Sequence, residues 1–174
     1  AMLVISGGGK ELGGERAELE QRVRAKAKET GVRLVGPNCI GSFGAAARFD
    51  TFFQSHERLV RPPDGPLAMT AQSGTYGCLF LEAAAETLGC GKLVSYGNRA
   101  DVDESDLVEH MAHDPKISVI ASYVEGLTDG RKYVQTVRRV IRETGKPCVV
   151  MKQGRTPEGA KAAMGHTGSY GGTY

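Results

Sequence analysis

The sequence predicts an α/β protein built around a mostly parallel sheet. Short apolar segments rich in β-branched residues alternate with longer segments whose apolar residues recur at intervals of about 3.6 residues. Buried parallel strands joined by right-handed crossover helices produce this alternation. Three helical segments also run into a glycine just before the next strand, at Gly31, Gly89 and Gly145, and glycine accepts the left-handed turn that ends a helix.

Each element follows from a short stretch of pattern. Six apolar segments are predicted to be buried strands: residues 2–5, 32–36, 66–70, 92–96, 117–124 and 147–152. Apolar residues spaced for one buried helix face lie between them: Leu19 and Val23; Cys78, Leu81 and Leu88; Leu107, Val108 and Met111; Tyr133, Val134, Val137, Val140 and Ile141. The third helix has an N-cap at Asp103 or Ser105, followed by acidic residues that suit a helix start.

The alternation breaks between about residues 42 and 65, where no strand is predicted and a proline- and glycine-rich stretch, RPPDG, closes the interval. We therefore expect a linker at 49–65. Residues 1–48 hold only two strands and one helix, so we predict the C-terminal fragment of a domain whose beginning is absent. Residues 66–174 form a second domain, which we expect to be truncated because a further helix and strand should follow.

Composition limits the class of protein. The 174 residues are 40% hydrophobic and 24% charged, as in a globular protein, and the net charge of +2 shows no basic run that would attract nucleic acid or a membrane surface. No apolar run reaches the length of a membrane span, and no signal peptide is evident. Four separated cysteines without a C-x-x-C pair indicate buried thiols in a reducing cytoplasm, and no metal site: Cys39, Cys78, Cys90 and Cys148.

Ligands of open parallel sheets bind at loops leaving the carboxyl ends of strands. The loop at 6–14, SGGGKELGG, fits neither a P-loop nor a dinucleotide motif and is interpreted as a flexible turn. Another loop, AQSGTYG, places Ser73, Gly74 and Thr75 where a helix begins, which suits either an anion site or a plain N-cap. In YVEG, Glu125 stands at the end of an apolar strand, where it is either a loop residue or a carboxylate that is solvated or paired.

The stretch AMGHTGSYGG near the chain end surrounds His166 with small residues. An imidazole there can act as acid, base, ligand or covalent nucleophile, and a mobile tail is nearly as good an interpretation. A phosphate on this ring would suit the helix start at Ser73–Thr75, and Glu125 could orient the ring. His56, His110 and His113 are predicted to be surface residues.

These motifs together resemble a known family. The order PNCIG (37–41), AQSGTYG (71–77), SYGNRADVDESDLVEHMAHDP (95–115), YVEG (123–126) and KPCVVMKQGRTPEGAKAAMGHTGSYGG (146–172) is similar to that of the nucleoside-diphosphate-forming acyl-CoA synthetases, relatives of the succinyl-CoA synthetase α subunit. The resemblance implies the C-terminal part of a Rossmann-type CoA-binding domain followed by a flavodoxin-like domain. It also implies a ligase that interconverts carboxylate, CoA and ATP with acyl-CoA, ADP and phosphate.

The resemblance implies roles for individual residues. His166 would be phosphorylated, and Glu125 would orient it. The helix start Ser73, Gly74 and Thr75 would hold the phosphate. Asn38 and Cys39 would lie in the turn near the CoA thiol and the acyl group. Gly165 precedes the histidine where the ADP-forming branch commonly has serine, a difference that we expect to affect the loop and not the chemistry.

The resemblance also implies partners. CoA and a carboxylate or acyl-CoA substrate would bind this part, whereas ATP or ADP with Mg would bind mainly to an ATP-grasp domain or subunit absent from the chain. We expect an oligomer. One alternative is a regulatory module that binds CoA or another small molecule, since related domains are fused to protein acetyltransferases. A flavodoxin-like electron carrier suits the fold but not the loops. A histidine suited to phosphorylation, together with Glu125, favours the ligase.

Overall fold

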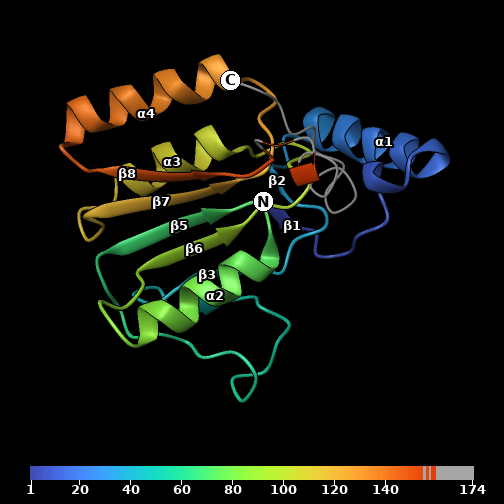
Figure 1. Ribbon diagram of the computed structural model, residues 1–174. Coiled ribbons are helices and arrows are strands. Elements are labelled where there is room, and N and C mark those ends of the chain that lie inside the picture. The colour runs from blue at the N-terminus through green and yellow to red at the C-terminus, as the bar shows by residue number, and fades with distance from the viewer. Residues whose placement is uncertain (155, 157, 160–174) are drawn as a thin grey trace.

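A computed structural model of the chain describes residues 1–154, 156, 158 and 159, and these residues form two sheets (Figure 1). The smaller sheet holds two parallel strands, β1 (Met2–Leu3) and β2 (Leu34–Val35). A short 3-10 helix (Lys10–Leu12) and α1 (Gly14–Thr30) connect them. The larger sheet has the strand order β4-β3-β6-β5-β7-β8.

The larger sheet is parallel except at one edge. Its strands are β3 (Ser42–Gly44), β4 (Phe49–Asp50), β5 (Leu67–Ala71), β6 (Lys92–Ser95), β7 (Val119–Val124) and β8 (Cys148–Lys152). Its helices are α2 (Gly74–Ala85), α3 (Glu104–Ala112) and α4 (Gly130–Thr144). Strands β5 to β8 pair in parallel, whereas β3 is antiparallel to both β4 and β6. The α/β architecture predicted from the sequence is confirmed.

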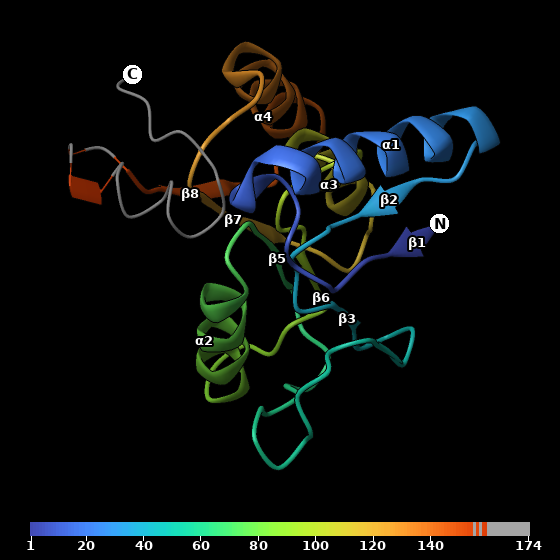
Figure 2. The same cartoon turned by 90° about the vertical axis from the view of Figure 1, so that its right-hand side faces the viewer.

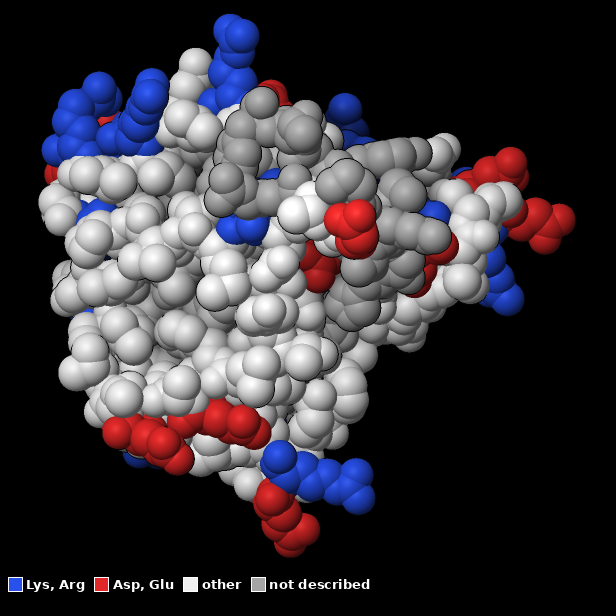
Figure 3. All heavy atoms as spheres, in the orientation of Figure 1, with Lys and Arg blue, Asp and Glu red and all other residues white. Residues whose placement is uncertain are grey.

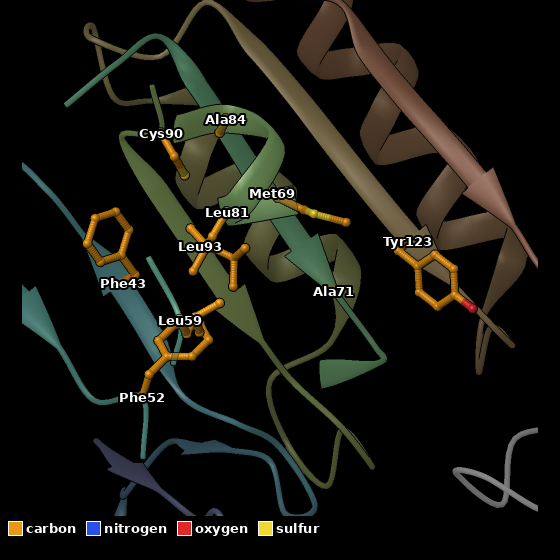
Figure 4. Close-up of a cluster of buried hydrophobic side chains, with 10 residues drawn as sticks. All are labelled: Phe43, Phe52, Leu59, Met69, Ala71, Leu81, Ala84, Cys90, Leu93 and Tyr123. Atoms are coloured by element: carbon orange, nitrogen blue, oxygen red, sulfur yellow. The ribbon is translucent and has the colours of Figure 1, made fainter. Parts of the chain in front are cut away.

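The helices lie on both faces of the large sheet. Figures 1 and 2 show α2 on one face and α3 with α4 on the other. Alternate side chains of β5 fill the two cores, because successive side chains of a strand point to opposite faces. Met69 packs in the cluster with Leu81 of α2 (Figure 4), and Ala68 packs in the cluster with Val108 of α3. Each helix layer therefore covers a continuous apolar core.

Most predicted elements are present where the pattern placed them. The last four predicted strands match β5 to β8 to within two residues at each end, and the first two contract to two residues each in β1 and β2. The third helix begins after Asp103, which accepts hydrogen bonds from the backbone N–H groups of Ser105 and Asp106. The strand pattern was therefore a sound guide, whereas the helical pattern overran α2, since Leu88 lies past its end and is 64% exposed.

The prediction that residues 42–65 contain no strand is wrong. Strands β3 and β4 lie in this interval, and β3 pairs with β6 through Ser42 opposite Val94 and Phe43 opposite Leu93. They are too short, at three and two residues, to display an alternating pattern. The division of the chain at 49–65 stays a prediction, and residues 42–50 add an antiparallel edge to the large sheet.

The predicted buried face of α1 is also wrong. Leu19 is 46% exposed and Val23 is 43% exposed, and Ala27 is the helix residue that is buried. In the described structure α1 connects the two short strands β1 and β2. A sheet of this size offers little surface to cover the apolar residues of the helix. Helix α4, which packs on the large sheet, buries Tyr133 and Val140 as predicted, whereas the predicted residues Val134 and Ile141 are exposed.

The four cysteines are free, and burial sets their acidity. Cys39 and Cys90 are buried as predicted, whereas Cys78 and Cys148 are half-buried. Burial raises the pKa of the Cys39 thiol to about 11 and that of Cys90 to about 12. These thiols are therefore neutral near pH 7.

Charge is unevenly spread over the surface. In Figure 3, Lys and Arg gather over α4 and acidic residues gather over α2, with a largely uncharged face between them. His56, His110 and His113 are exposed, as predicted. Within the described residues, no helix is both long enough and apolar enough to span a membrane.

Candidate functional site

The carboxyl ends of the parallel strands meet at one edge of the large sheet. Figure 1 shows β5, β6, β7 and β8 pointing toward the same side, where α1 and β2 lie. Backbone bonds join the segments just past the strand ends: Tyr96 N donates to Ala71 O at 3.0 Å, and Gln72 N donates to Tyr123 O at 3.0 Å. Ligands of open α/β sheets bind at such an edge, so the residues that follow these strands define the candidate site.

Ser73, Gly74 and Thr75 form the start of α2. Ser73 is the N-cap residue and only 4% exposed, yet its side chain makes no capping hydrogen bond in this fully described helix. The first turn of α2 contains no acidic residue. Backbone N–H groups and the helix dipole favour an anion at such an end. The turn can therefore accept a phosphate group without displacing a carboxylate.

The start of α2 packs against the turn that follows β2. A Cβ atom built on Gly74 would lie 2.3 Å from Ile40 Cγ2, so a larger residue has no room. Ile40 N donates to Ser95 Oγ at 3.3 Å, which fixes this turn to the end of β6. The structure thereby brings the turn that holds Asn38 and Cys39 beside the start of α2.

Asn38 and Cys39 lie at the tip of this turn. Asn38 has a left-handed backbone, with φ of 58°, and its Nδ2 donates to Asn98 Oδ1 at 3.3 Å. The Cys39 thiol donates to Val4 O at 3.3 Å and is 4% exposed. A Cβ on Gly97 would lie 2.1 Å from Asn38 O, so the loop after β6 presses directly on the turn. Cys39 therefore contributes packing here, and its buried neutral thiol is not suited to act as a nucleophile.

Glu125 directly follows β7 and is 4% exposed. Its backbone N–H donates to Gln72 Oε1 at 2.9 Å, and the N–H of Gly126 donates to the same oxygen at 3.2 Å. Its carbonyl oxygen accepts a hydrogen bond from Lys152 Nζ at 2.8 Å. Glu125 is therefore held by its backbone from two neighbouring strands, and Gln72, the residue before Ser73, connects it to the start of α2.

Two cationic side chains lie beside the Glu125 loop. Arg99 donates to Gly126 O, and its Nε donates to Thr128 Oγ1 at 2.9 Å. Its Nη1 is also 3.8 Å from Glu104 Oε2, and both side chains are almost fully buried. Burial lowers the pKa of Lys152, an effect that the Glu125 carboxylate opposes. Positive charge therefore lies at the strand ends where an anionic ligand would bind.

The loop at residues 6–14 is more ordered than a flexible turn, so that interpretation is wrong. Lys10 Nζ donates to Asn98 O at 2.5 Å. Asn98 Nδ2 in turn donates to Glu11 Oε2 at 2.6 Å and to Glu20 Oε2 at 3.0 Å. Burial would raise the pKa of Glu11, but hydrogen bonds from Asn98 and from nearby backbone N–H groups outweigh it and lower the pKa. This polar cluster joins the loop after β1 to the loop after β6.

A cavity of about 280 Å³ lies over the carboxyl ends of β1 and β2. Ser6, Gly7, Gly8 and Gly9 form one wall, and Pro37 with α1 forms another. Leu19 and Val23, the exposed apolar residues of α1, line it as well. An apolar wall opposite a glycine loop can hold the chain of an elongated ligand close to the Asn38 turn.

The structure brings together most of the predicted site and adds residues that the sequence did not reveal. Ser73–Thr75, Glu125 and the Asn38–Cys39 turn lie on one edge, whereas His166 lies outside the described residues. Gln72, Arg99 and Lys152 were missed, because they hold the Glu125 loop through its backbone atoms, and such contacts leave no motif in the sequence. The described residues contain no group of His, Cys, Asp or Glu that could hold a metal ion.

The chain resembles known proteins over nearly its whole length. It is 43% identical to the ADP-forming acetate–CoA ligase I of Archaeoglobus fulgidus over 99% of this chain and 24% of that protein. It is 37% identical to the α subunit of ADP-forming acetate–CoA ligase I of Pyrococcus furiosus over 98% of this chain and 36% of the subunit. The chain thus spans about a quarter to a third of the curated relatives it matches.

A solved structure agrees with the sequence comparisons. The dinucleotide-forming acetyl-coenzyme A synthetase 1 of Ca. Korarchaeum cryptofilum, in complex with phosphate and ADP, matches with a TM-score of 0.84 and 37% identity over 98% of this chain and 36% of that chain. The model of the family described as the succinyl-CoA ligase like flavodoxin domain matches residues 64–174. The resemblance seen in the motifs is therefore confirmed, and this chain belongs to the succinyl-CoA ligase like flavodoxin domain family.

Proposed function

We propose that this chain is the α-type part of a nucleoside-diphosphate-forming acyl-CoA synthetase. Such an enzyme interconverts a carboxylate, CoA and ATP with acyl-CoA, ADP and phosphate. One observation carries the proposal. The helix start at Ser73–Thr75, which can bind an anion, is connected to the buried Glu125, because Gln72 Oε1 accepts a hydrogen bond from the Glu125 backbone N–H. The names of the relatives, ADP-forming ligases of acetate and CoA, support the same reaction.

The reaction divides into three transfers. Phosphate attacks the acyl carbonyl of acyl-CoA, and the thiolate of CoA leaves, which gives an acyl phosphate. His166 then attacks the phosphorus and releases the carboxylate, and ADP finally takes the phosphoryl group from the histidine to form ATP. A covalent nucleophile divides one difficult transfer into two easier ones.

Each described site residue has a place in this scheme. The N–H groups at Ser73–Thr75 would hold the phosphoryl oxygens while charge develops on them. Glu125 would accept a hydrogen bond from one imidazole nitrogen and so direct the other nitrogen at phosphorus. Asn38 and Cys39 would form the turn near the CoA thiol, with the pantetheine chain in the cavity beside Ser6–Gly9. Arg99 and Lys152 add positive charge near the transferred group.

The remaining chemistry requires a partner. We propose that an ATP-grasp domain or subunit binds ATP or ADP with Mg, and that the acting enzyme is an oligomer working in the cytoplasm. The P. furiosus relative is itself named a subunit α, and each relative extends well beyond the length of this chain. Such a division would let a phosphorylated side chain carry the group between two sites.

The proposal is tested by detecting the phosphorylated intermediate. The complete enzyme with its ATP-grasp part, incubated with radiolabelled ATP and Mg, should acquire label on this chain that is lost in acid and kept in alkali. His166→Ala should abolish that label. Glu125→Gln should slow its formation at least about tenfold, because a misdirected ring loses the in-line geometry. His113→Ala, at an exposed histidine, is the matched control and should label normally.

Two results would overturn the proposal. Persistent label in His166→Ala would show that another residue carries the phosphoryl group. Complete absence of label in the unaltered enzyme, with acyl phosphate as well as with ATP, would leave the regulatory module as the better interpretation.

A further inference from the structure

We propose that Gln72 is a positioning residue, which fixes the Glu125 backbone against the start of α2. The inference rests on the proposed function of Glu125 and Ser73–Thr75 and goes one step further. It assigns to the residue before Ser73 the task of holding the phosphate-binding turn and the orienting carboxylate in one fixed relation.

The first argument is the hydrogen-bond geometry. A single side-chain oxygen, Gln72 Oε1, accepts from the N–H of Glu125 at 2.9 Å and from the N–H of Gly126 at 3.2 Å. Gln72 is 1% exposed, so water does not replace these bonds easily. Buried N–H groups left without an acceptor are costly. The loop therefore has a strong reason to stay where the amide oxygen lies.

The second argument is the position of Gln72 in the chain. It follows β5 directly and precedes Ser73, the N-cap of α2. Its backbone N–H also donates to Tyr123 O at 3.0 Å, which continues the β5–β7 ladder past the last strand residue. Main chain and side chain thus hold the end of β7 at two points, and any displacement of Ser73 is transmitted to Glu125.

The third argument is chemical. Gln72 lies next to a turn expected to hold a phosphate and beside a glutamate, so a second carboxylate there would add repulsion. A carboxamide provides the same acceptor oxygen without charge. The carbonyl side of the loop is held differently, by Lys152 at Glu125 O and by Arg99 at Gly126 O. Gln72, which adjoins the phosphate-binding turn, therefore holds the N–H side of this loop through its side chain.

The decisive variant is Gln72→Met, which keeps the length of the side chain and removes the acceptor. In the complete enzyme we expect phosphohistidine formation to slow by about 10- to 100-fold, because small misplacements of reacting groups cost factors of this size. The KM for ATP should be unchanged, since the nucleotide binds to the ATP-grasp part. If Gln72→Met fails to fold, Gln72→Asn, whose amide is one methylene shorter, is tested in the same way.

The variant Thr70→Val separates a loss of stability from a loss of positioning. Thr70 lies two residues earlier in β5, is fully buried, and donates to Ser122 Oγ at 3.0 Å, away from the Glu125 loop. Thr70→Val should shift the midpoint of urea unfolding about as much as Gln72→Met does, and it should leave the rate of phosphohistidine formation unchanged. Equal slowing in both variants would mean that Gln72 acts only through stability, and the proposal would be wrong.

The double variant Gln72→Met with Glu125→Gln identifies the route. A residue that acts through Glu125 has nothing left to position once the carboxylate is gone, so the double variant should be no slower than Glu125→Gln alone. A double variant slowed by the product of the two single-variant factors would overturn the inference. If Glu125→Gln itself retained the unaltered rate, the proposed role of Glu125 would fail instead, and the two failures are thereby distinguished.

Discussion

At Gly74 the first turn of α2 comes so close to Ile40 that no side chain fits between them. A Cβ atom would lie 2.3 Å from Ile40 Cγ2 and 3.2 Å from Cγ1. Gly74→Ala should therefore lower the free energy of unfolding by about 1–3 kcal/mol, the usual cost of overpacking a dense core. It should also weaken phosphate binding, because the displaced atoms belong to the turn that would bind it. Urea unfolding and phosphate titration measure the two effects.

The cause of this loss can be isolated with a second substitution. Ile40→Ala removes both clashing atoms, so the double variant should lose less stability than the sum of the single variants. Gly130→Ala provides a control in a helix start with room, since its Cβ would be 3.6 Å from Leu127 Cδ1. It should be neutral or slightly stabilising. Full additivity of Gly74→Ala and Ile40→Ala would contradict the steric argument.

Single residues of the site differ in how well the sequence reveals them. Ser73 and Glu125 were found because each polar residue follows an apolar strand, and the carboxyl end of a strand is where ligands bind. Gln72 follows the same strand as Ser73 but was missed, because its role depends on which strand lies beside β5. That neighbour is β7, which is not the next strand along the chain.

Helix α3 illustrates how one residue starts an element and joins it to another. Asp103 Oδ1 accepts from the N–H groups of Ser105 and Asp106, and Asp103 Oδ2 accepts from Lys132 Nζ of α4 at 2.7 Å. Burial would raise the pKa of Asp103, but the hydrogen bonds from Lys132 and from the backbone N–H groups lower it overall. The ionised carboxylate therefore stabilises both the helix start and the contact between α3 and α4.

Asp103→Ala should cost about 0.5–2 kcal/mol of unfolding free energy at pH 7, the usual range for a lost N-cap. Asp103→Asn should cost less, because the amide oxygen still caps the helix. Since folding lowers the pKa, the stabilisation is present above the unfolded value of about 3.9 and is lost as the pH falls through the folded value.

Urea unfolding at a series of pH values tests this. The gap between the unaltered chain and Asp103→Asn should close between about pH 4 and the lower folded pKa. A gap that is constant over this range would show that the charge of Asp103 contributes nothing.

Elements were predicted best where they are long and repeat their pattern. Strand β7 has six residues and β5 has five, so apolar runs marked both of them. Strands β3 and β4 have too few residues for any period, and their pairing with β6 depends on contacts between distant segments. The buried face of α1 was overestimated for a different reason: only Leu19 and Val23, four residues apart, marked it, and the two-stranded sheet offers little surface to cover them.

At the scale of the whole molecule, the two sheets are joined by a band of polar contacts. The segment after β6 runs along β2, where Ala100 N donates to Gly36 O at 2.9 Å and Val102 N donates to Leu34 O at 3.0 Å. Asp101, between them, accepts from Arg33 Nε and from Leu34 N, each at 2.8 Å. No local pattern links residues so far apart, so the sequence predicted separate parts and not their junction.

This band predicts that α1 and the small sheet open separately from the large sheet once the junction is weakened. Burial would raise the pKa of Asp101, but its bonds to Arg33 and Leu34 lower it, so the carboxylate is ionised at neutral pH. Asp101→Ala should weaken the junction by about 1 kcal/mol, and amide hydrogen exchange in α1 should quicken about fivefold at pH 7. Exchange in β5 and β7 should change little, because their bonds lie within the large sheet.

The matched control is Asp114→Ala, which removes an ion pair of 2.6 Å with Lys92 inside the larger sheet region. Asp114→Ala should not change the ratio of the amide hydrogen exchange rate in α1 to the rates in β5 and β7. Equal acceleration of α1 and of the large sheet in Asp101→Ala would mean that the chain opens as one unit. In that case the contacts of Asp101 would not separate the stability of the small sheet from that of the large one, and the loop carrying Asn38 would be as firmly held as Glu125.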